Sequence, residues 1–91
     1  MSYAPISDFG DKPALEYPLT WNYRLIGAVE EHLRAALVAV LGSRDHRVKP
    51  GNRSANGRYC SIELELTVES DADRHALFEL LRAQSAVVYV L

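Results

Sequence analysis

A cluster of basic side chains in the middle of the chain is the feature of this sequence best suited to binding chemistry. Half of the ten basic residues fall within fifteen positions, opposed only by Asp45: Arg44, Arg47, Lys49, Arg53 and Arg58. The segment carries +4, which leaves −6 on the rest of a chain whose net charge is −2. A basic loop on an acidic body predicts a site for an acidic partner surface or a small anionic metabolite.

The residues between these cations suit such a site. Gly51 and Gly57 let the backbone approach a ligand closely, and Ser54 and Asn56 supply hydrogen-bond donors. The sequence therefore predicts that an anion or a partner is bound by five residues: Lys49, Arg53, Ser54, Asn56 and Arg58. The alternative is that the arginines only keep a long connecting loop soluble.

Histidine and cysteine are too scattered to predict a metal site or a catalytic group. His32, His46, Cys60 and His75 show neither C-x-x-C nor H-x-x-x-H spacing. Cys60, the single cysteine, lies on the apolar side of a predicted strand, which is typical of a buried thiol in a reducing compartment. We therefore expect no catalytic residue, no cofactor and no metal, and a protein that is not an enzyme.

The cellular location is predicted from two features of the sequence, the composition of its N-terminus and the length of its apolar stretches. The N-terminus shows no charged leader followed by an apolar block, so no secretory signal is apparent. The longest apolar-rich stretch, 35–41, is far shorter than a bilayer-spanning helix. We expect a cytoplasmic protein with no membrane partner.

The secondary structure that positions the basic loop follows from hydrophobic periodicity. The run 59–69 alternates, so its apolar side chains cover a core on one face while the other face meets water. Five further elements are predicted, namely a strand over 19–26, a helix over 29–41, a strand over 46–50, a helix over 71–83 and a strand over 86–91. Val29 is expected on the apolar stripe of the first helix, and Gly42 is expected to end that helix. Ser70 with Asp73 resembles a capping box that opens the second helix. The inner face of the second helix is expected to carry Arg74, Leu77, Phe78 and Leu81.

The order β-α-β-β-α-β with right-handed crossovers predicts an α+β fold, the ferredoxin-like plait. Its four-stranded antiparallel sheet has strand order 4-1-3-2, with both helices on one face. The second strand lies at an edge because Pro50 cannot donate to a ladder. We expect one domain over 17–91, preceded by a flexible tail over 1–16, which contains two prolines and a glycine without periodicity.

Two other functions of plaits are not favoured by these residues. RNA-binding plaits stack bases on an open sheet face, whereas this face offers Glu63 and Glu65 where a phosphate backbone would pass. An acylphosphatase needs a loop of backbone donors after the first strand, and the turn at Gly27 and Ala28 is too short to form it. We expect no nucleic-acid partner.

Several short motifs resemble the YbeD-like family of small bacterial proteins of unknown function. The resemblance covers 17–91 and is carried by Tyr17-Pro18, the run 23–27 (Tyr-Arg-Leu-Ile-Gly), Val48-Lys49-Pro50, the pattern Ser54-x-x-Gly57-x-Tyr59-x-Ser61, and Val90-Leu91. The family implies a plait similar to the ligand-binding ACT regulatory domain, a link by gene neighbourhood to lipoate attachment, and no established activity.

These observations together predict a non-enzymatic regulatory or interaction module, which binds a partner protein or a small metabolite. The family resemblance implies a link to lipoate metabolism, and the alternative is a small enzyme or enzyme subunit in lipoyl metabolism. The apolar run 88–91 at the C-terminal edge also predicts a weak homodimer. The alternative to that homodimer is a monomer whose N-terminal tail covers the same edge.

Overall fold

The structure, a computed structural model, describes residues 15–91. These form β1 (Leu19–Gly27), α2 (Glu30–Leu41), β2 (Arg47–Arg53), β3 (Cys60–Val68), α3 (Asp71–Arg82) and β4 (Tyr89–Val90). The predicted flexible tail lies almost entirely outside the described residues. No helix within the described range is long and apolar enough to cross a membrane.

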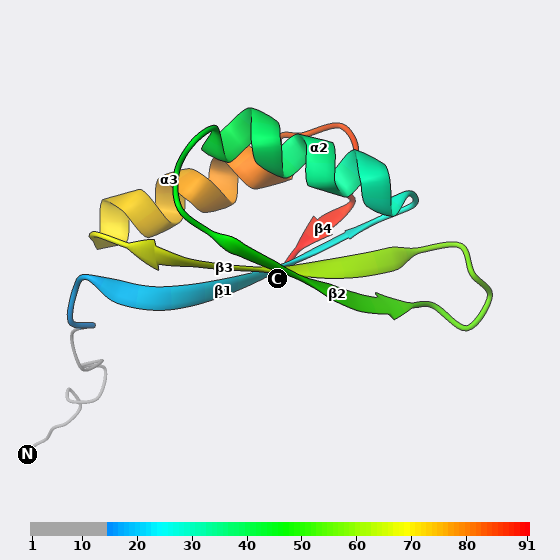
Figure 1. The fold of residues 1–91 in the computed structure, drawn as a ribbon, viewed down its shortest axis with the longest axis horizontal. Coiled ribbons are helices and arrows are strands. Elements are labelled where there is room, and N and C mark those ends of the chain that lie inside the picture. Colours follow the sequence, from blue (N-terminus) through cyan, green and yellow to red (C-terminus); the bar gives the residue numbers. More distant parts are fainter. Residues whose placement is uncertain (1–14) are drawn as a thin grey trace, which may run out of the picture.

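The four strands form one antiparallel sheet in the order β2-β3-β1-β4, and both helices cover the same face of it (Figure 1). The predicted fold class and strand order are therefore confirmed. The two central strands pair along their whole length, from Leu19 opposite Val68 to Gly27 opposite Cys60. This uninterrupted pair is the frame on which the rest of the molecule is placed.

The core fills the space between the helices and one face of the sheet. The period of two along β3 buries every second side chain, as predicted, while Glu63 and Glu65 on the other face meet solvent. The most completely buried large side chains come from both layers: Leu25, Leu33, Leu37, Ile62, Leu64, Val68 and Leu81. Cys60 is among the buried residues, which confirms its predicted side of the strand.

The turn from β1 into α2 is tight because Gly27 has no side chain. A Cβ at this position would lie 2.4 Å from the carbonyl oxygen of Ala86 and 2.7 Å from Cδ2 of Leu33. Val29, predicted as part of the inner face of the helix, instead precedes it and is 39% exposed. The helix ends at Gly42, whose φ of +57° and N–H bond to the Val38 carbonyl make it the predicted stop.

The start of α3 is a variant of the capping box that the sequence predicts, in which Asp73 bonds the N–H of Glu69 instead of that of the N-cap Ser70. The Ser70 hydroxyl accepts a hydrogen bond from the Asp73 N–H at 3.0 Å, and Asp73 Oδ2 accepts one from the Glu69 N–H at 2.9 Å. Leu77 and Leu81 are buried on the inner face of this helix. Phe78, also predicted there, is 37% exposed, because it lies beside a part of β1 that β4 does not cover.

Two strands differ in length from the prediction. β2 continues past Pro50 to Arg53 through a bulge, because Gly51 lets the backbone pass close to Ser61; a Cβ at Gly51 would meet its hydroxyl at 2.3 Å. β4 contains only two residues instead of 86–91. Part of that segment forms the turn after α3, where the Val87 N–H donates to the Gln84 carbonyl.

Candidate functional site

The predicted basic site lies on the β2–β3 hairpin, which extends beyond the helices at one end of the sheet (Figure 1). Residues 54–59 form the loop between the two strands. Gly57 occupies the left-handed region with a φ of +73°, and its N–H donates to the Ser54 carbonyl at 2.8 Å. Two consecutive strands and their loop therefore hold the five predicted binding residues at one edge of the molecule.

Ser54 and Asn56 have a structural role that the sequence did not reveal. The Ser54 hydroxyl donates to Asn56 Oδ1 at 2.8 Å and accepts from the Tyr59 N–H at 3.1 Å. Asn56 Oδ1 also accepts from the Arg58 N–H at 2.9 Å. Both oxygens are thus used to close the loop, so only the Asn56 amide nitrogen is left as a side-chain donor for a ligand.

The three cations of the predicted site are exposed on this hairpin. Lys49 lies opposite Glu63 in the β2–β3 register, and the Arg53 guanidinium donates to the Gly57 carbonyl at 3.1 Å. None of Lys49, Arg53 and Arg58 makes an ion pair with another described residue. Arg53 also borders an open hollow shared with Glu30, where a carboxylate reduces the local positive potential.

Arg44 lies in the basic segment of the sequence but is not available to an external anion. Its guanidinium donates to both carboxylate oxygens of Asp73, at 3.0 and 2.6 Å, and to the Thr67 carbonyl at 2.8 Å. This bidentate contact holds the pKa of the Asp73 carboxyl below its usual value, mainly through the hydrogen bond from Arg44. The cationic segment free of acids is therefore 46–60, with four Lys and Arg residues.

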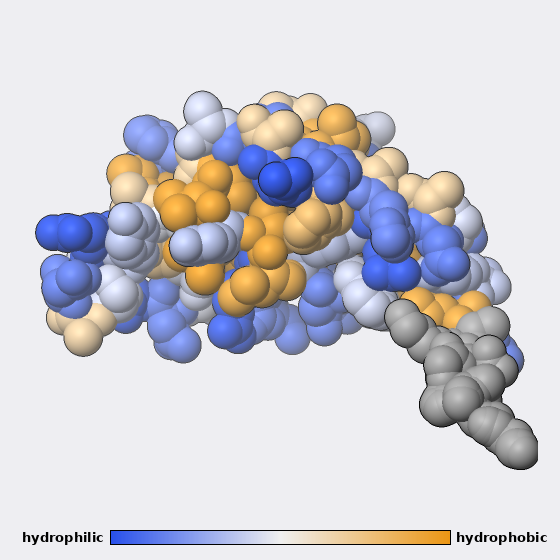
Figure 2. Space-filling view, turned by 180° about the vertical axis from the view of Figure 1, so that it is seen from behind, coloured by the Kyte–Doolittle hydropathy of each residue, from blue (hydrophilic) through white to orange (hydrophobic). Residues whose placement is uncertain are grey.

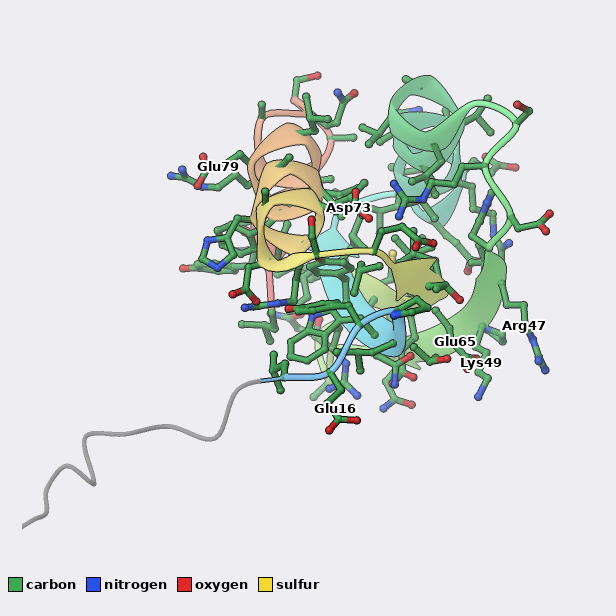
Figure 3. The ribbon with its side chains drawn as sticks, turned by 90° about the vertical axis from the view of Figure 1, so that its left-hand side faces the viewer. Glu16, Arg47, Lys49, Glu65, Asp73 and Glu79 are labelled. Carbon is green, nitrogen blue, oxygen red and sulfur yellow. The ribbon has the colours of Figure 1, made fainter. Side chains whose placement is uncertain are left out.

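The open face of the sheet carries charges of both signs in adjacent positions. Lys49, Glu63 and Arg24 form one row across three strands, and Arg24 bonds Glu63 at 2.8 Å. Arg47 and Glu65 lie opposite each other in the next row. Figure 3 shows the side chains of Arg47 and Lys49 extending away from β2 into solvent. This face suits neither an apolar ligand nor a long anion.

An apolar surface lies on the side of the molecule away from β2, where β1, α3 and the C-terminal segment meet. The sequence did not predict it as a site. Figure 2 shows apolar side chains gathered on this side, and the exposed large hydrophobic residues of the C-terminal segment and α3 are Phe78, Leu80, Val88, Tyr89 and Leu91. A groove of about 390 Å³ runs between β1 and α3, lined by residues that include Trp21, Asn22, Phe78 and Leu91.

One end of this groove is organised by Arg74. Its guanidinium lies 4.8 Å from the centre of the Trp21 ring, and its Nε donates to the Tyr17 hydroxyl at 3.1 Å. The Tyr17 hydroxyl in turn donates to Asp71, and this bond is the main reason why the pKa of the Asp71 carboxyl is lowered. The Tyr23 hydroxyl donates to the Arg74 carbonyl at 2.5 Å. The inward stem of Arg74, predicted from the helical pattern, was the only sequence signal for this arrangement.

Candidate metal ligands do not come together in the part of the chain that the structure describes. No group of three or more histidine, cysteine, aspartate or glutamate side chains within 15–91 is placed to hold a metal ion. His46 makes a local contact instead, with Nδ1 at 2.7 Å from the Arg44 carbonyl.

With this geometry established, comparison with known proteins identifies the relatives of the chain. Residues 12–91 match the family described as Protein of unknown function (DUF493). The chain belongs to this family. The family resemblance carried by the sequence motifs is thereby confirmed. An uncharacterised protein of Campylobacter jejuni is 34% identical over 85 residues, which cover 91% of this chain and 95% of that protein.

Two solved structures are similar in fold to this chain. The solution structure of a Helicobacter pylori protein, 26% identical, has a TM-score of 0.79 and covers 100% of this chain and 98% of that one. The ACT domain of a GTP pyrophosphokinase of Chlorobium tepidum is 17% identical, with a TM-score of 0.56, covering 79% of this chain and 94% of that domain. This second likeness shows the fold alone, and it confirms the expected ACT-like architecture.

Proposed function

We propose that this chain is a non-enzymatic regulatory or interaction module of ACT-like fold, located in the cytoplasm. It binds an acidic surface of a partner protein, or a small anionic metabolite, through the β2–β3 hairpin. Lys49, Arg53 and Arg58 supply the positive charge, and the Asn56 amide supplies a neutral donor.

The observation that carries this proposal is the charge of the hairpin. Segment 46–60 holds four Lys and Arg residues and no acid, in a chain whose net charge is −2. The hairpin extends beyond the helices (Figure 1), so an anion can approach it from several directions. Arg44, which bonds Asp73, shows by contrast what a structural arginine looks like in this protein. A potential of this kind attracts an anionic partner over about one Debye length, 8 Å at physiological salt.

The test is a thermal-shift and NMR titration screen against amino acids, nucleotides, and lipoyl and octanoyl compounds, followed by affinity measurements on each hit. The double variant Arg53→Glu and Arg58→Glu should abolish binding while the circular dichroism spectrum stays unchanged. The matched control is Arg34→Glu and Arg82→Glu, which makes the same change in net charge on exposed arginines of the two helices. The affinity of the wild type should also fall with added salt.

Binding that survives in the folded hairpin variant would show that the arginines of the hairpin only keep a connecting loop soluble. Equal loss in the two double variants would show a response to overall charge rather than a site. Lipoyl or octanoyl compounds as hits would support the link to lipoate metabolism that the family resemblance implies. Chemical turnover of any compound would instead favour the alternative, a small enzyme or enzyme subunit.

A further inference from the structure

One stretch of β1 has no strand on its outer side in the described part of the chain. β3 pairs with β1 along its whole length, whereas β4 pairs only with Leu25 and Ile26. The pairing ends where Arg24 and Leu91 exchange two backbone hydrogen bonds, at 3.0 and 2.8 Å. Residues 19–23 therefore leave an open strand edge roughly 16 Å long at about 3.3 Å per residue.

The backbone groups along this edge point outward at alternate residues. Arg24 and Ile26 direct their main-chain groups to the C-terminal segment, as their bonds to Leu91 and Val88 show. The β1–β3 register is unbroken, so every second residue of β1 has the same orientation. The N–H and C=O groups of Asn22 and Thr20 thus point away from β3, toward the unpaired edge of β1. Such an edge is a template for one more strand.

A groove for a side chain lies directly beside these backbone groups. The 390 Å³ groove between β1 and α3 includes Trp21 and Asn22 in its lining, with Phe78 on the helix side. A residue of an added strand that sits opposite Trp21 would share its face of the sheet, so its side chain would enter the groove. Backbone pairing and a pocket for alternate side chains are the two parts of a strand-addition site.

We propose that an extended segment of a partner protein adds to the sheet beside Thr20 and Asn22. The residue opposite Asn22 exchanges backbone hydrogen bonds with it. The residue opposite Trp21 places a large apolar side chain in the groove. This site is separate from the basic hairpin, which lies at the other edge of the sheet, and it does not depend on the function proposed for that hairpin.

The charges around the edge favour a neutral, apolar segment. Arg24 is already paired with Glu63 at 2.8 Å, and Arg74 with Asp71 at 3.4 Å. Glu79, which also borders the groove, bonds an arginine of its own helix at 3.1 Å. With each neighbouring cation and anion matched, an apolar side chain complements the groove better than a charged one.

The shape of the edge favours a chain segment over a second folded copy. Leu91 bounds the open stretch at one end, and Pro18, which has no N–H, bounds it at the other. A second copy offers a β1 edge with the same bounds, or a β2 edge that carries Pro50 and exposed cations. A segment of about five extended residues enters such a stretch without bringing another sheet with it.

The experiment uses the full chain and a phage-displayed library of random twelve-residue peptides. Peptides with apolar residues at alternate positions should be enriched, and the best one is then synthesised. Its binding is measured by fluorescence polarisation, and amide hydrogen exchange is followed by NMR. The Asn22 amide should exchange at least tenfold more slowly at saturation. The Tyr23 amide, which faces β3, should be protected with and without peptide.

Two variants and one control locate the peptide. Asn22→Pro removes a donor that the β1–β3 ladder does not use, and Phe78→Glu places a carboxylate at the groove. Each should weaken peptide binding at least tenfold. Leu80→Glu introduces the same carboxylate at a more exposed position of α3 outside the groove, and it should leave the affinity for the peptide within twofold. If Asn22→Pro fails to fold, Phe78→Glu and the Asn22 exchange rate decide the question.

Three results would overturn the proposal. The first is a library with no enriched peptide, and the second is a peptide whose affinity neither variant changes. The third is an Asn22 amide that is already protected in the chain alone. Protection that rises with protein concentration would assign the edge to a second copy. Protection independent of concentration would assign it to another part of the same chain.

Discussion

The contact between Arg44 and Asp73 allows a prediction of stability that separates two roles of the Asp73 carboxylate. Asp73 accepts two hydrogen bonds from Arg44 and one from the Glu69 N–H at the start of α3. The helix-capping bond is worth about 1 kcal/mol. The ion pair adds about 1 kcal/mol, a value reduced by solvent because the two side chains are 32% and 21% exposed. Asp73→Ala should therefore lower the free energy of unfolding by about 2 kcal/mol.

The assay is urea unfolding followed by far-UV circular dichroism. Asp73→Asn keeps an oxygen for the Glu69 N–H and loses the charge, so it should cost about half as much as Asp73→Ala. A double-mutant cycle with Arg44→Ala should give a coupling free energy of about 1 kcal/mol. A coupling near zero, or equal costs for the two Asp73 variants, would refute the division between capping and ion pairing.

The same carboxylate predicts a dependence on pH. Because the pKa of Asp73 is lower in the folded protein than its usual 3.8, its charged form stabilises the fold. This contribution is fully present above pH 3.8 and is lost as the pH falls through the folded pKa. The stability difference between wild type and Asp73→Asn should accordingly narrow on acidification below about pH 4. A difference that stays constant down to the acid transition would show that the charge contributes nothing.

Three further predictions test the fold. Leu64→Asp, which places an unpaired charge in the core, should lower the free energy of unfolding by several kcal/mol. Glu63→Ala, on the open face, should lower it by roughly 0.5 kcal/mol or less. Similar losses for the two variants in urea unfolding would contradict the assignment of Leu64 to the core face and Glu63 to the open face. Gly27→Ala, whose Cβ would meet a carbonyl oxygen at 2.4 Å, should cost about 1–3 kcal/mol, and a neutral effect would mean that the turn is looser than described. Burial raises the pKa of Tyr23 above 10.0, so wild-type stability should fall as the pH rises past 10.0, and Tyr23→Phe should abolish this tyrosine's contribution to the fall. Near pH 7, Tyr23→Phe should lower the free energy of unfolding by about 1 kcal/mol, because the bond to the Arg74 carbonyl is lost. Calorimetry of wild type and variant near pH 7 and above pH 10.0 measures both effects.

The fold could be predicted because the strongest local signals were also the ones that tertiary structure uses. Alternation along β3, the capping box at Ser70 and the glycine after α2 each decide one element, and all three agree with the observed order. The lengths of β2 and β4 could not be predicted in this way. They depend on a close approach of Gly51 to Ser61 and on how much chain the turn after α3 consumes.

The site was predicted less completely, for a physical reason. Composition identifies a cation but not its partner, so the basic cluster of the sequence includes Arg44 together with Arg53. The fold places Asp73 beside Arg44, 29 positions away, and this contact removes Arg44 from the cations available to a ligand. Ser54 and Asn56 are favoured in turns because their oxygens bond nearby backbone groups. Here those local bonds close the loop and take the oxygens that a ligand would otherwise meet.

The apolar groove escaped prediction because no short segment contains it. Its lining comes from β1, α3 and the last residue of the chain, and it exists only because β4 is shorter than the strand it borders. An exposed Phe78 has the same helical spacing as a buried one. The pattern alone therefore cannot tell a core position from a position beside an uncovered strand edge.

The two candidate binding surfaces lie at opposite edges of one sheet, and this arrangement makes their tests independent. β2 carries the cations at one edge, and β3 separates it from β1, whose open stretch lies on the side away from β3. A change of charge in the hairpin alters neither the backbone donors of Asn22 nor the groove beside Phe78. An acidic ligand at one edge and an apolar peptide at the other could therefore occupy the same molecule. Coupling between them would have to pass through β1 and β3, the most continuously paired and most deeply buried strands of the protein.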